Sequence, residues 1–194
     1  AGWICGNRHY RREMGTVGPP AKHQEFIIID GSGAPCPPGI EGEITIGGAQ
    51  TCMGTISPEG VFEDLSEARI KTGDLGMMNG DGFVTVTGRT KDLIIRGGVN
   101  IAPLEIDNVL LANPKVREAA AVGVPDDIYG EEVIAFVSVI PGEELSEEDV
   151  KSWCAASLPA FKAPKQIYFT DDLPKSDRGK VLRDGLRDMW ISAK

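Results

Sequence analysis

The chain has 194 residues, of which 41% are hydrophobic and 25% are charged, values typical of a soluble globular protein. Its formal net charge of −9 excludes the large basic surface that DNA or RNA binding requires, so we expect no nucleic-acid partner. No apolar run approaches the length of a transmembrane helix and the N-terminus lacks a signal-peptide pattern. These features predict a cytoplasmic protein.

The cysteines indicate neither a disulfide framework nor a metal site. No two of them form a CxxC pair, and no histidine lies at a ligand spacing beside them. We therefore expect no metal ligands in this chain and free thiols in a reducing compartment, at Cys5, Cys36, Cys52 and Cys154.

Residues 16–88 have the pattern of a small β-rich domain. Short apolar or alternating segments at 25–30 and 41–47 are typical of strands. Turn signals rich in Gly, Pro and Asn separate the segments, and the strongest is the Asn-Gly-Asp-Gly sequence at 79–82. Short strands and turns so closely spaced predict a barrel-like or sandwich subdomain with few helices before residue 89.

The pattern changes after Arg89. A helix is expected at 103–112, where Pro103 suits the first turn and apolar residues recur at helical spacing. A second helix is expected from Ser146, which can cap it, to about Leu158. The other expected elements are strands at 92–96, 116–124, 132–140 and 166–170 and a helix at 182–191.

We therefore predict an α+β fold in two parts. Residues 1–88 form the β-rich part, and residues 92–194 form a small α+β domain with a short sheet and flanking helices. Residues 89–91 would join the two parts.

Asp74 and Arg89 are the first candidate site residues. Asp74 follows a glycine at a strand end, where a carboxylate can accept both hydroxyl groups of a ribose. The alternative is an aspartate that caps a turn. Arg89 could pair with a phosphate or a ribose, or belong to an ordinary charged linker.

Two further candidates lie beyond Arg89. Gly97 and Gly98 would let a ligand approach the backbone closely, or would simply form a tight turn. Lys180 ends a loop that contains proline and glycine, and could place a positive charge on a phosphate or a developing oxyanion. A solvated lysine is the alternative. The sequence contains neither a Walker A loop nor a strand followed by GxGxxG.

Four segments in order resemble one family. They read KTGDLG, GRTKDLIIRGGVNIAPLEID, VGVPDDIYGEEV and LPKSDRGKVLR. Together they are similar to the adenylate-forming superfamily, which includes acyl-CoA synthetases, adenylation domains of peptide synthetases and luciferases. The resemblance runs from about residue 15 to residue 186, although Thr55 and Ile70 stand where the family usually has aromatic residues.

The resemblance implies two half-reactions. A carboxylic acid attacks the α-phosphate of ATP, with Mg²⁺, to give an acyl-adenylate and pyrophosphate; the thiol of CoA then displaces AMP. It implies that Asp74 and Arg89 bind the nucleotide and that Lys180 is catalytic in the first step. Lys91 would be the hinge, and the loop of Gly97 and Gly98 would line the path of the CoA thiol in the second step.

The family's phosphate-binding loop and its YGxTE-like segment are not found in these 194 residues. We therefore interpret the chain as a C-terminal portion that needs the upstream remainder of the large domain as its partner, and alone would not turn over ATP. A homodimer, a non-catalytic nucleotide- or partner-binding module and a peptide-synthetase adenylation domain are left open. The acid substrate is not determined by this sequence.

Overall fold

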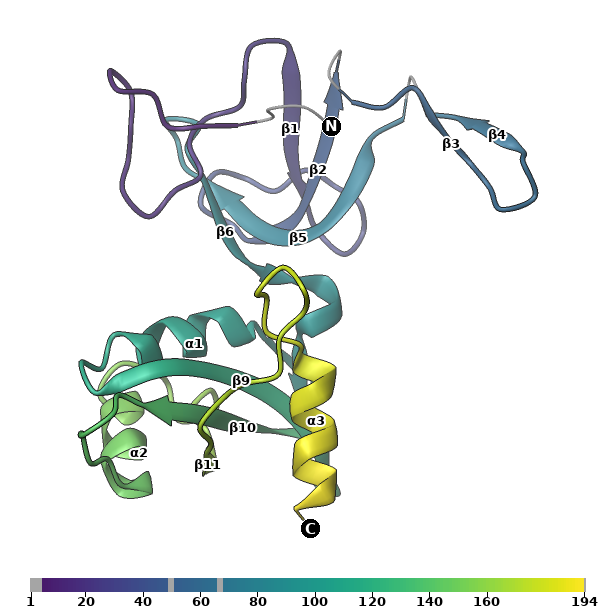
Figure 1. The fold of residues 1–194 in the computed structure, drawn as a ribbon. Coiled ribbons are helices and arrows are strands. Elements are labelled where there is room, and N and C mark those ends of the chain that lie inside the picture. The colour runs from purple at the N-terminus through teal and green to yellow at the C-terminus, as the bar shows by residue number, and fades with distance from the viewer. Residues whose placement is uncertain (1–4, 49–50, 66–67, 194) are drawn as a thin grey trace. The chain divides into compact units, whose positions relative to one another are not determined.

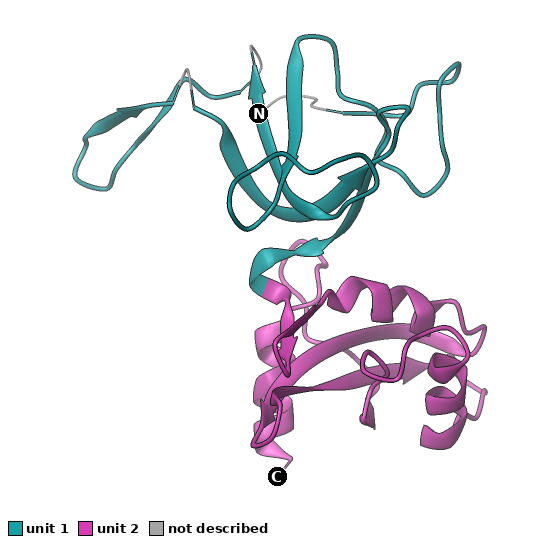
Figure 2. Ribbon diagram, turned by 180° about the vertical axis from the view of Figure 1, so that it is seen from behind, with its two compact units in different colours: residues 1–91 teal, residues 92–194 magenta. Residues whose placement is uncertain are grey.

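The computed structural model describes residues 5–48, 51–65 and 68–193. They form two compact units, residues 1–91 and residues 92–194, which Figure 2 colours teal and magenta. Each unit is described by itself. None of the helices in the described part of the chain is long and apolar enough to cross a membrane.

The first unit is built on a four-stranded antiparallel sheet with the order β1-β2-β5-β6. A separate two-stranded ribbon pairs β3 with β4. The bounds are β1 Gln24–Ile29, β2 Gly42–Gly48, β3 Gly54–Ile56, β4 Phe62–Asp64, β5 Ile70–Met78 and β6 Val84–Arg89.

The core of this sheet is small. Ile28, Ile44, Ile46 and Val84 are its buried members, and Phe26 and Val86 are among the side chains that pack on them. The order β1-β2-β5-β6 leaves β1 and β6 at opposite edges, so across the described residues the sheet is open. Four strands are too few to close round a core of their own, which corrects the barrel-like expectation for this unit.

The second unit is a sheet with helices on both faces. β10 pairs with β9 antiparallel and with β11 parallel, and β7 and β8 continue the sheet (Figure 1). The bounds are β7 Ile94–Arg96, β8 Val99–Ile101, α1 Pro103–Leu111, β9 Val116–Asp126, β10 Gly130–Val139, α2 Glu147–Ala155, β11 Gln166–Phe169 and α3 Arg183–Ser192.

Alternation along β9 and β10 explains the two layers. Because successive strand residues point to opposite faces, Ala121 and Val133 join the core under α1 and α2, whereas Val122 and Ile134 join the core under α3. The middle of each strand is therefore a nearly continuous apolar run, with charged residues toward the ends. The predicted α+β class is confirmed.

Residues at the N-termini of α1 and α2 explain where these helices begin. Pro103 occupies the first turn of α1, where its missing N–H costs nothing. Ser146 caps α2: its side chain accepts the Asp149 N–H, and the Asp149 side chain accepts the Ser146 N–H in return. Neither Ala102 before α1 nor Leu182 before α3 provides a side-chain cap.

Candidate functional site

Asp74 and Arg89 lie opposite each other on β5 and β6. The Arg89 Nε donates to Asp74 Oδ1 at 2.8 Å, and the Asp74 N–H donates to the hydroxyl of Thr72 at 3.1 Å. The two side chains keep 47% and 33% of their surface exposed, so this pair stabilises the fold by only about 0–1 kcal/mol. No described residue donates to the other Asp74 oxygen, Oδ2. The pair is thus available to accept hydroxyl groups and to meet an anion.

The backbone around Asp74 is shaped by Gly73, whose φ is +73°. A β-bulge follows between Leu75 and Gly76, and it shifts the register of β5 against β6. The bulge re-aims the strand end that carries Asp74. The hydroxyl of Thr90 donates to the Gly73 carbonyl at 3.2 Å and ties this turn to the end of β6.

Lys91 lies in a single turn of 3₁₀ helix, Thr90–Asp92. Its side chain is exposed, and no ion pair or hydrogen bond joins its ammonium to any of the described residues. The boundary between the two compact units falls directly after it. A short helical turn of this kind has few contacts to resist a change of backbone angles.

Gly97 and Gly98 form the two-residue turn between β7 and β8. Their φ angles are +58° and +82°, and the flanking residues Arg96 and Val99 pair across the hairpin. Two positive φ angles in succession are what a type I′ turn requires. The Gly97 N–H donates to the carbonyl of Tyr129 at 2.8 Å.

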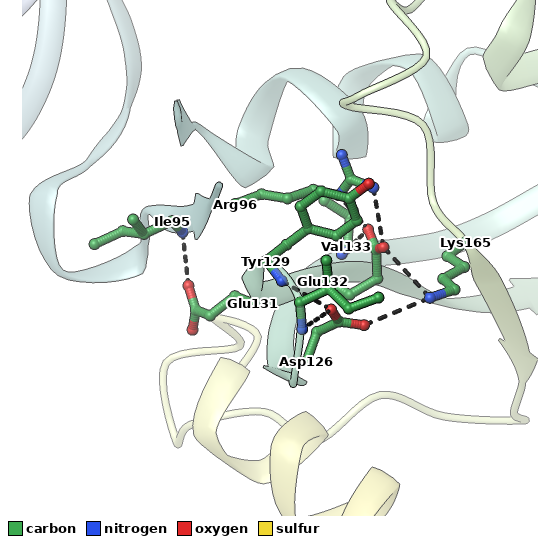
Figure 3. Close-up of polar contacts among 9 residues, drawn as sticks. Ile95, Arg96, Asp126, Tyr129, Glu131, Glu132, Val133 and Lys165 are labelled. Atoms are coloured by element: carbon green, nitrogen blue, oxygen red, sulfur yellow. Dashed lines mark hydrogen bonds and ion pairs between the residues drawn. The ribbon is translucent and has the colours of Figure 1, made fainter. Parts of the chain in front are cut away.

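A polar cluster braces this glycine turn (Figure 3). The Arg96 guanidinium lies 4.1 Å from the centre of the Tyr129 ring and donates twice to Glu132, at 2.6 and 3.1 Å. Lys165 lies 3.6 Å from the Glu132 carboxylate and 3.5 Å from that of Asp126. On the other side of the hairpin, Glu131 accepts the N–H of Ile95 at 2.6 Å.

The electrostatics of Glu132 show how tightly this cluster is held. Burial raises the pKa of its carboxyl, but the hydrogen bonds from Arg96 and the Val133 N–H and the charges of Arg96 and Lys165 together bring that pKa below its ordinary value. Glu132 is therefore ionised and holds Arg96 in place. The Gly97–Gly98 turn is thus flanked by a side chain with two charged hydrogen bonds and is itself bonded to Tyr129.

Two of the hollows in the described part of the second unit differ in character. One, of about 540 Å³, lies beside the polar cluster, and its charged lining consists of Arg96, Lys151 and Lys165 against Glu132. The other, of about 910 Å³, includes four carboxylates and one guanidinium in its lining, those of Glu143, Glu144, Asp171, Asp172 and Arg117. Of these two, the smaller hollow suits a phosphate-bearing ligand.

Lys180 closes a small hairpin loop. Its carbonyl accepts the N–H of Ser176 at 2.8 Å, Gly179 takes a φ of +76°, and Lys175 and Val181 form an isolated bridge. Within the described part of the second unit, the other lysine ammoniums form ion pairs, whereas that of Lys180 meets no partner. The loop is thus held by backbone hydrogen bonds and presents an unpaired ammonium at Lys180.

The structure brings some of the predicted site residues together. Asp74 and Arg89 touch, and Gly97 and Gly98 share one turn. The ammoniums of Lys91 and Lys180 make no ion pair with any of the described residues. No group of three or more described His, Cys, Asp or Glu side chains is arranged to hold a metal.

Sequence reasoning missed the residues that support the site. Arg96, Tyr129 and Glu132 were inside quoted motifs but had no assigned role, since 36 residues separate Arg96 from its partner Glu132. The buried pair of Asp107 and Arg183 is separated by 76 residues. The available signal for the polar cluster was the pair of acidic residues, Glu131 and Glu132, directly before the apolar run of β10.

Comparison with known proteins gives the family. Residues 105–180 match the AMP-binding enzyme C-terminal domain. The chain is 39% identical over 176 residues to an oxalate–CoA ligase of Saccharomyces cerevisiae, covering 89% of this chain and 32% of that protein. It is 38% identical over 185 residues to a fatty acid–[acyl-carrier-protein] ligase of Streptomyces coeruleorubidus, covering 91% of this chain and 34% of that protein.

A solved structure agrees with these relatives. ATP-bound MatB from Rhodopseudomonas palustris is 33% identical, with a TM-score of 0.79, over 91% of this chain and 36% of that one. The chain belongs to the adenylate-forming enzymes, of which it is a C-terminal portion. It spans about a third of the length of the relatives it matches.

Proposed function

We propose that the chain is the C-terminal portion of an AMP-forming acid–thiol ligase, in which it supplies part of the nucleotide site and a mobile domain. The reaction would join a carboxylic acid to ATP as an acyl-adenylate and then pass the acyl group to the thiol of CoA. The observation that carries the proposal is the free ammonium of Lys180 on an ordered loop, at the end of the matched region. Similarity to CoA ligases supports it.

The first unit suits the nucleoside part of ATP. A carboxylate with one oxygen free can accept the two hydroxyls of a ribose, as acidic residues do in other nucleotide sites. Arg89 holds Asp74 through Nε, which leaves its other nitrogens to meet the ribose or a phosphate. ATP, when bound with Mg²⁺, supplies the electrophilic α-phosphate.

Lys180 would act where negative charge grows. Attack by the acid carboxylate builds charge on the α-phosphate oxygens, and an ammonium held close to them lowers the barrier. Because no described acid neutralises Lys180, its full charge is available. The ordered backbone of the loop limits the entropy lost when the side chain takes up that position.

The second unit offers another face for the second half-reaction. The Gly97–Gly98 turn has no Cβ atoms, so a narrow acyl acceptor could pass against the backbone. The hollow lined by Arg96, Lys151 and Lys165 lies in the same unit and would attract the phosphates of CoA. Rotation about Lys91 would present Lys180 first and the glycine turn second.

A carrier-protein thiol is a second candidate acceptor. The Streptomyces coeruleorubidus relative is named for an acyl-carrier-protein product, and the yeast relative for a CoA product. We retain a cytoplasmic location within the proposal, consistent with the four cysteines being free thiols.

The test is acid-dependent ATP–pyrophosphate exchange by the complete enzyme, over a panel of carboxylic acids. Lys180→Ala should lower exchange by roughly 10²–10³-fold, the usual loss for one such charge-stabilising contact. Lys22→Ala is the matched control, because Lys22 is also exposed and unpaired among the described residues. Unchanged exchange in Lys180→Ala, or an equal loss in both variants, would contradict the assignment.

A further inference from the structure

A buried ion pair lies at the start of α3, shortly after the Lys180 loop. Asp107 in α1 is 6% exposed, and it accepts the N–H of Ala121 at 2.7 Å and a guanidinium N–H of Arg183 at 2.5 Å. Arg183 also donates to the carbonyl of Ala121. The pair therefore uses both backbone groups of one β9 residue and joins α1, β9 and α3.

The position of Arg183 links this pair to the loop. Arg183 is the first residue of α3 and comes three residues after Lys180. Just before it, the Leu182 N–H donates to the carbonyl of Pro174 at 2.8 Å and closes the base of the loop. A displacement of Arg183 would therefore move the loop that carries Lys180.

Arg183 also reaches the first residue of the second unit, next to the proposed hinge. Its Nε lies 3.9 Å from a carboxylate oxygen of Asp92, the residue that follows Lys91. One guanidinium thus contacts the segment next to Lys91, the edge of β9 and α1. Its planar fork of donors suits three partners at once, which the point charge of a lysine does not.

Stability alone is a weak reason for such a pair. Burying two charges costs free energy that their attraction repays only when geometry is favourable, and an apolar pair often does as well. Burial raises the pKa of Asp107, and the hydrogen bond and charge of Arg183 oppose that rise. A second reason for the Asp107–Arg183 pair is that it fixes the start of α3, and with it the loop that carries Lys180.

We propose that Arg183 is a positioning residue for adenylate formation. It fixes the Lys180 loop to Asp107 and to Asp92, so that movement of the second unit at Lys91 carries the Lys180 ammonium as a rigid body. The inference rests on the proposed role of Lys180. It assigns Arg183 no contact with substrate.

Arg187 is the matched control. It lies one turn later on α3, and its Nε donates to the Gly123 carbonyl of the same strand at 3.0 Å. Its carboxylate partner, Asp184, is 93% exposed, at a distance of 3.1 Å. Arg187 thus shares the helix, the strand and the chemical type of Arg183 but has no link to Asp107 or Asp92.

The experiment separates the half-reactions in the complete enzyme. Arg183→Gln should lower acid-dependent ATP–pyrophosphate exchange by roughly 10²-fold, as a misplaced catalytic group does. Thioester formation from supplied acyl-adenylate should stay within about threefold, as should both reactions of Arg187→Gln. Arg183→Lys keeps the charge and provides the test if Arg183→Gln does not fold; it should show an intermediate loss confined to exchange.

Two results would overturn the proposal. One is an equal loss of both half-reactions in the Arg183 variants, which is the signature of a merely structural residue. The other is an exchange loss in Arg187→Gln as large as that in Arg183→Gln.

Amide hydrogen exchange distinguishes this proposal from the assignment of Lys180. In Arg183→Gln the amides of Ser176 and Leu182 should exchange roughly tenfold faster, the size expected for one lost hydrogen bond, and in Lys180→Ala they should not change. If Lys180→Ala retains pyrophosphate exchange, the proposed role of Lys180 fails. The amide exchange of the loop still decides whether Arg183 fixes the loop in place. Unchanged amide exchange in Arg183→Gln would refute the proposal that Arg183 fixes the loop.

Discussion

The two compact units bury their apolar side chains very differently. In the second unit the sheet is covered on both faces, by α1 and α2 on one side and α3 on the other. In the first unit the described core cluster, on one sheet, has four buried members. The β3–β4 ribbon and its flanks leave Met53, Ile56, Val61 and Phe62 more than half exposed.

This difference separates a self-contained domain from a part of a larger one. A sheet packed on both faces satisfies its apolar residues within the unit. A single small core with exposed apolar residues beside it is typical of a surface that contacts another protein segment. We propose that this segment is the remainder of the large domain, because the relatives are about three times as long as the chain.

Separating the units gives the largest expected effect. Residues 92–194 expressed alone should unfold in one cooperative transition, because both of their cores are complete. Residues 1–91 alone should lack a sharp transition. Thermal unfolding followed by circular dichroism would show this, and a more stable isolated first unit would reverse the comparison.

The next largest effect expected is a difference between the two units in the stability lost on replacing one apolar side chain. Leu110 is fully buried in α1, so Leu110→Ala should lower the free energy of unfolding by about 2–5 kcal/mol. Ile56→Thr in the β3–β4 ribbon, where Ile56 is 72% exposed, should change it by less than about 0.5 kcal/mol. Urea denaturation of both variants measures the contrast, and similar losses would contradict it.

Acid should weaken the second unit through Glu132. Because its folded pKa lies below the ordinary value, its ionised form stabilises the fold above the unfolded pKa of about 4.3, and this stabilisation disappears as pH falls through the folded pKa. Near pH 6 the free energy of unfolding of the wild type should exceed that of Glu132→Gln by about 1.5–3 kcal/mol, the range for hydrogen bonds to charged groups. The difference should shrink as pH falls through the folded pKa of Glu132. A difference independent of pH would show that the Arg96 pair contributes nothing through its charge.

The sequence predicted the regular elements of the second unit well. The apolar runs at 116–124 and 132–140 correspond to β9 and β10, and the Ser146 cap located α2. That helix ends at Ala155, earlier than the expected Leu158. Strand β8 was not predicted, although a tight turn at Gly97 and Gly98 was one of the two alternatives left open by the sequence.

The contacts of the site were harder to predict. Asp74 and Arg89 were recognised by motif, but their pairing depends on a register that the bulge at Leu75 and Gly76 shifts. Strand periodicity alone cannot place such a bulge. The pair of Asp107 and Arg183 depends on α1 and α3 meeting the same edge of β9, which no local pattern specifies.

The most direct test of the account concerns the joint between the two units. Proline at position 91 would fix φ and remove the N–H of that residue. In the complete enzyme, Lys91→Pro should retain acid-dependent ATP–pyrophosphate exchange and lose thioester formation from supplied acyl-adenylate. Thioester formation at the wild-type rate in Lys91→Pro would contradict rotation about this residue.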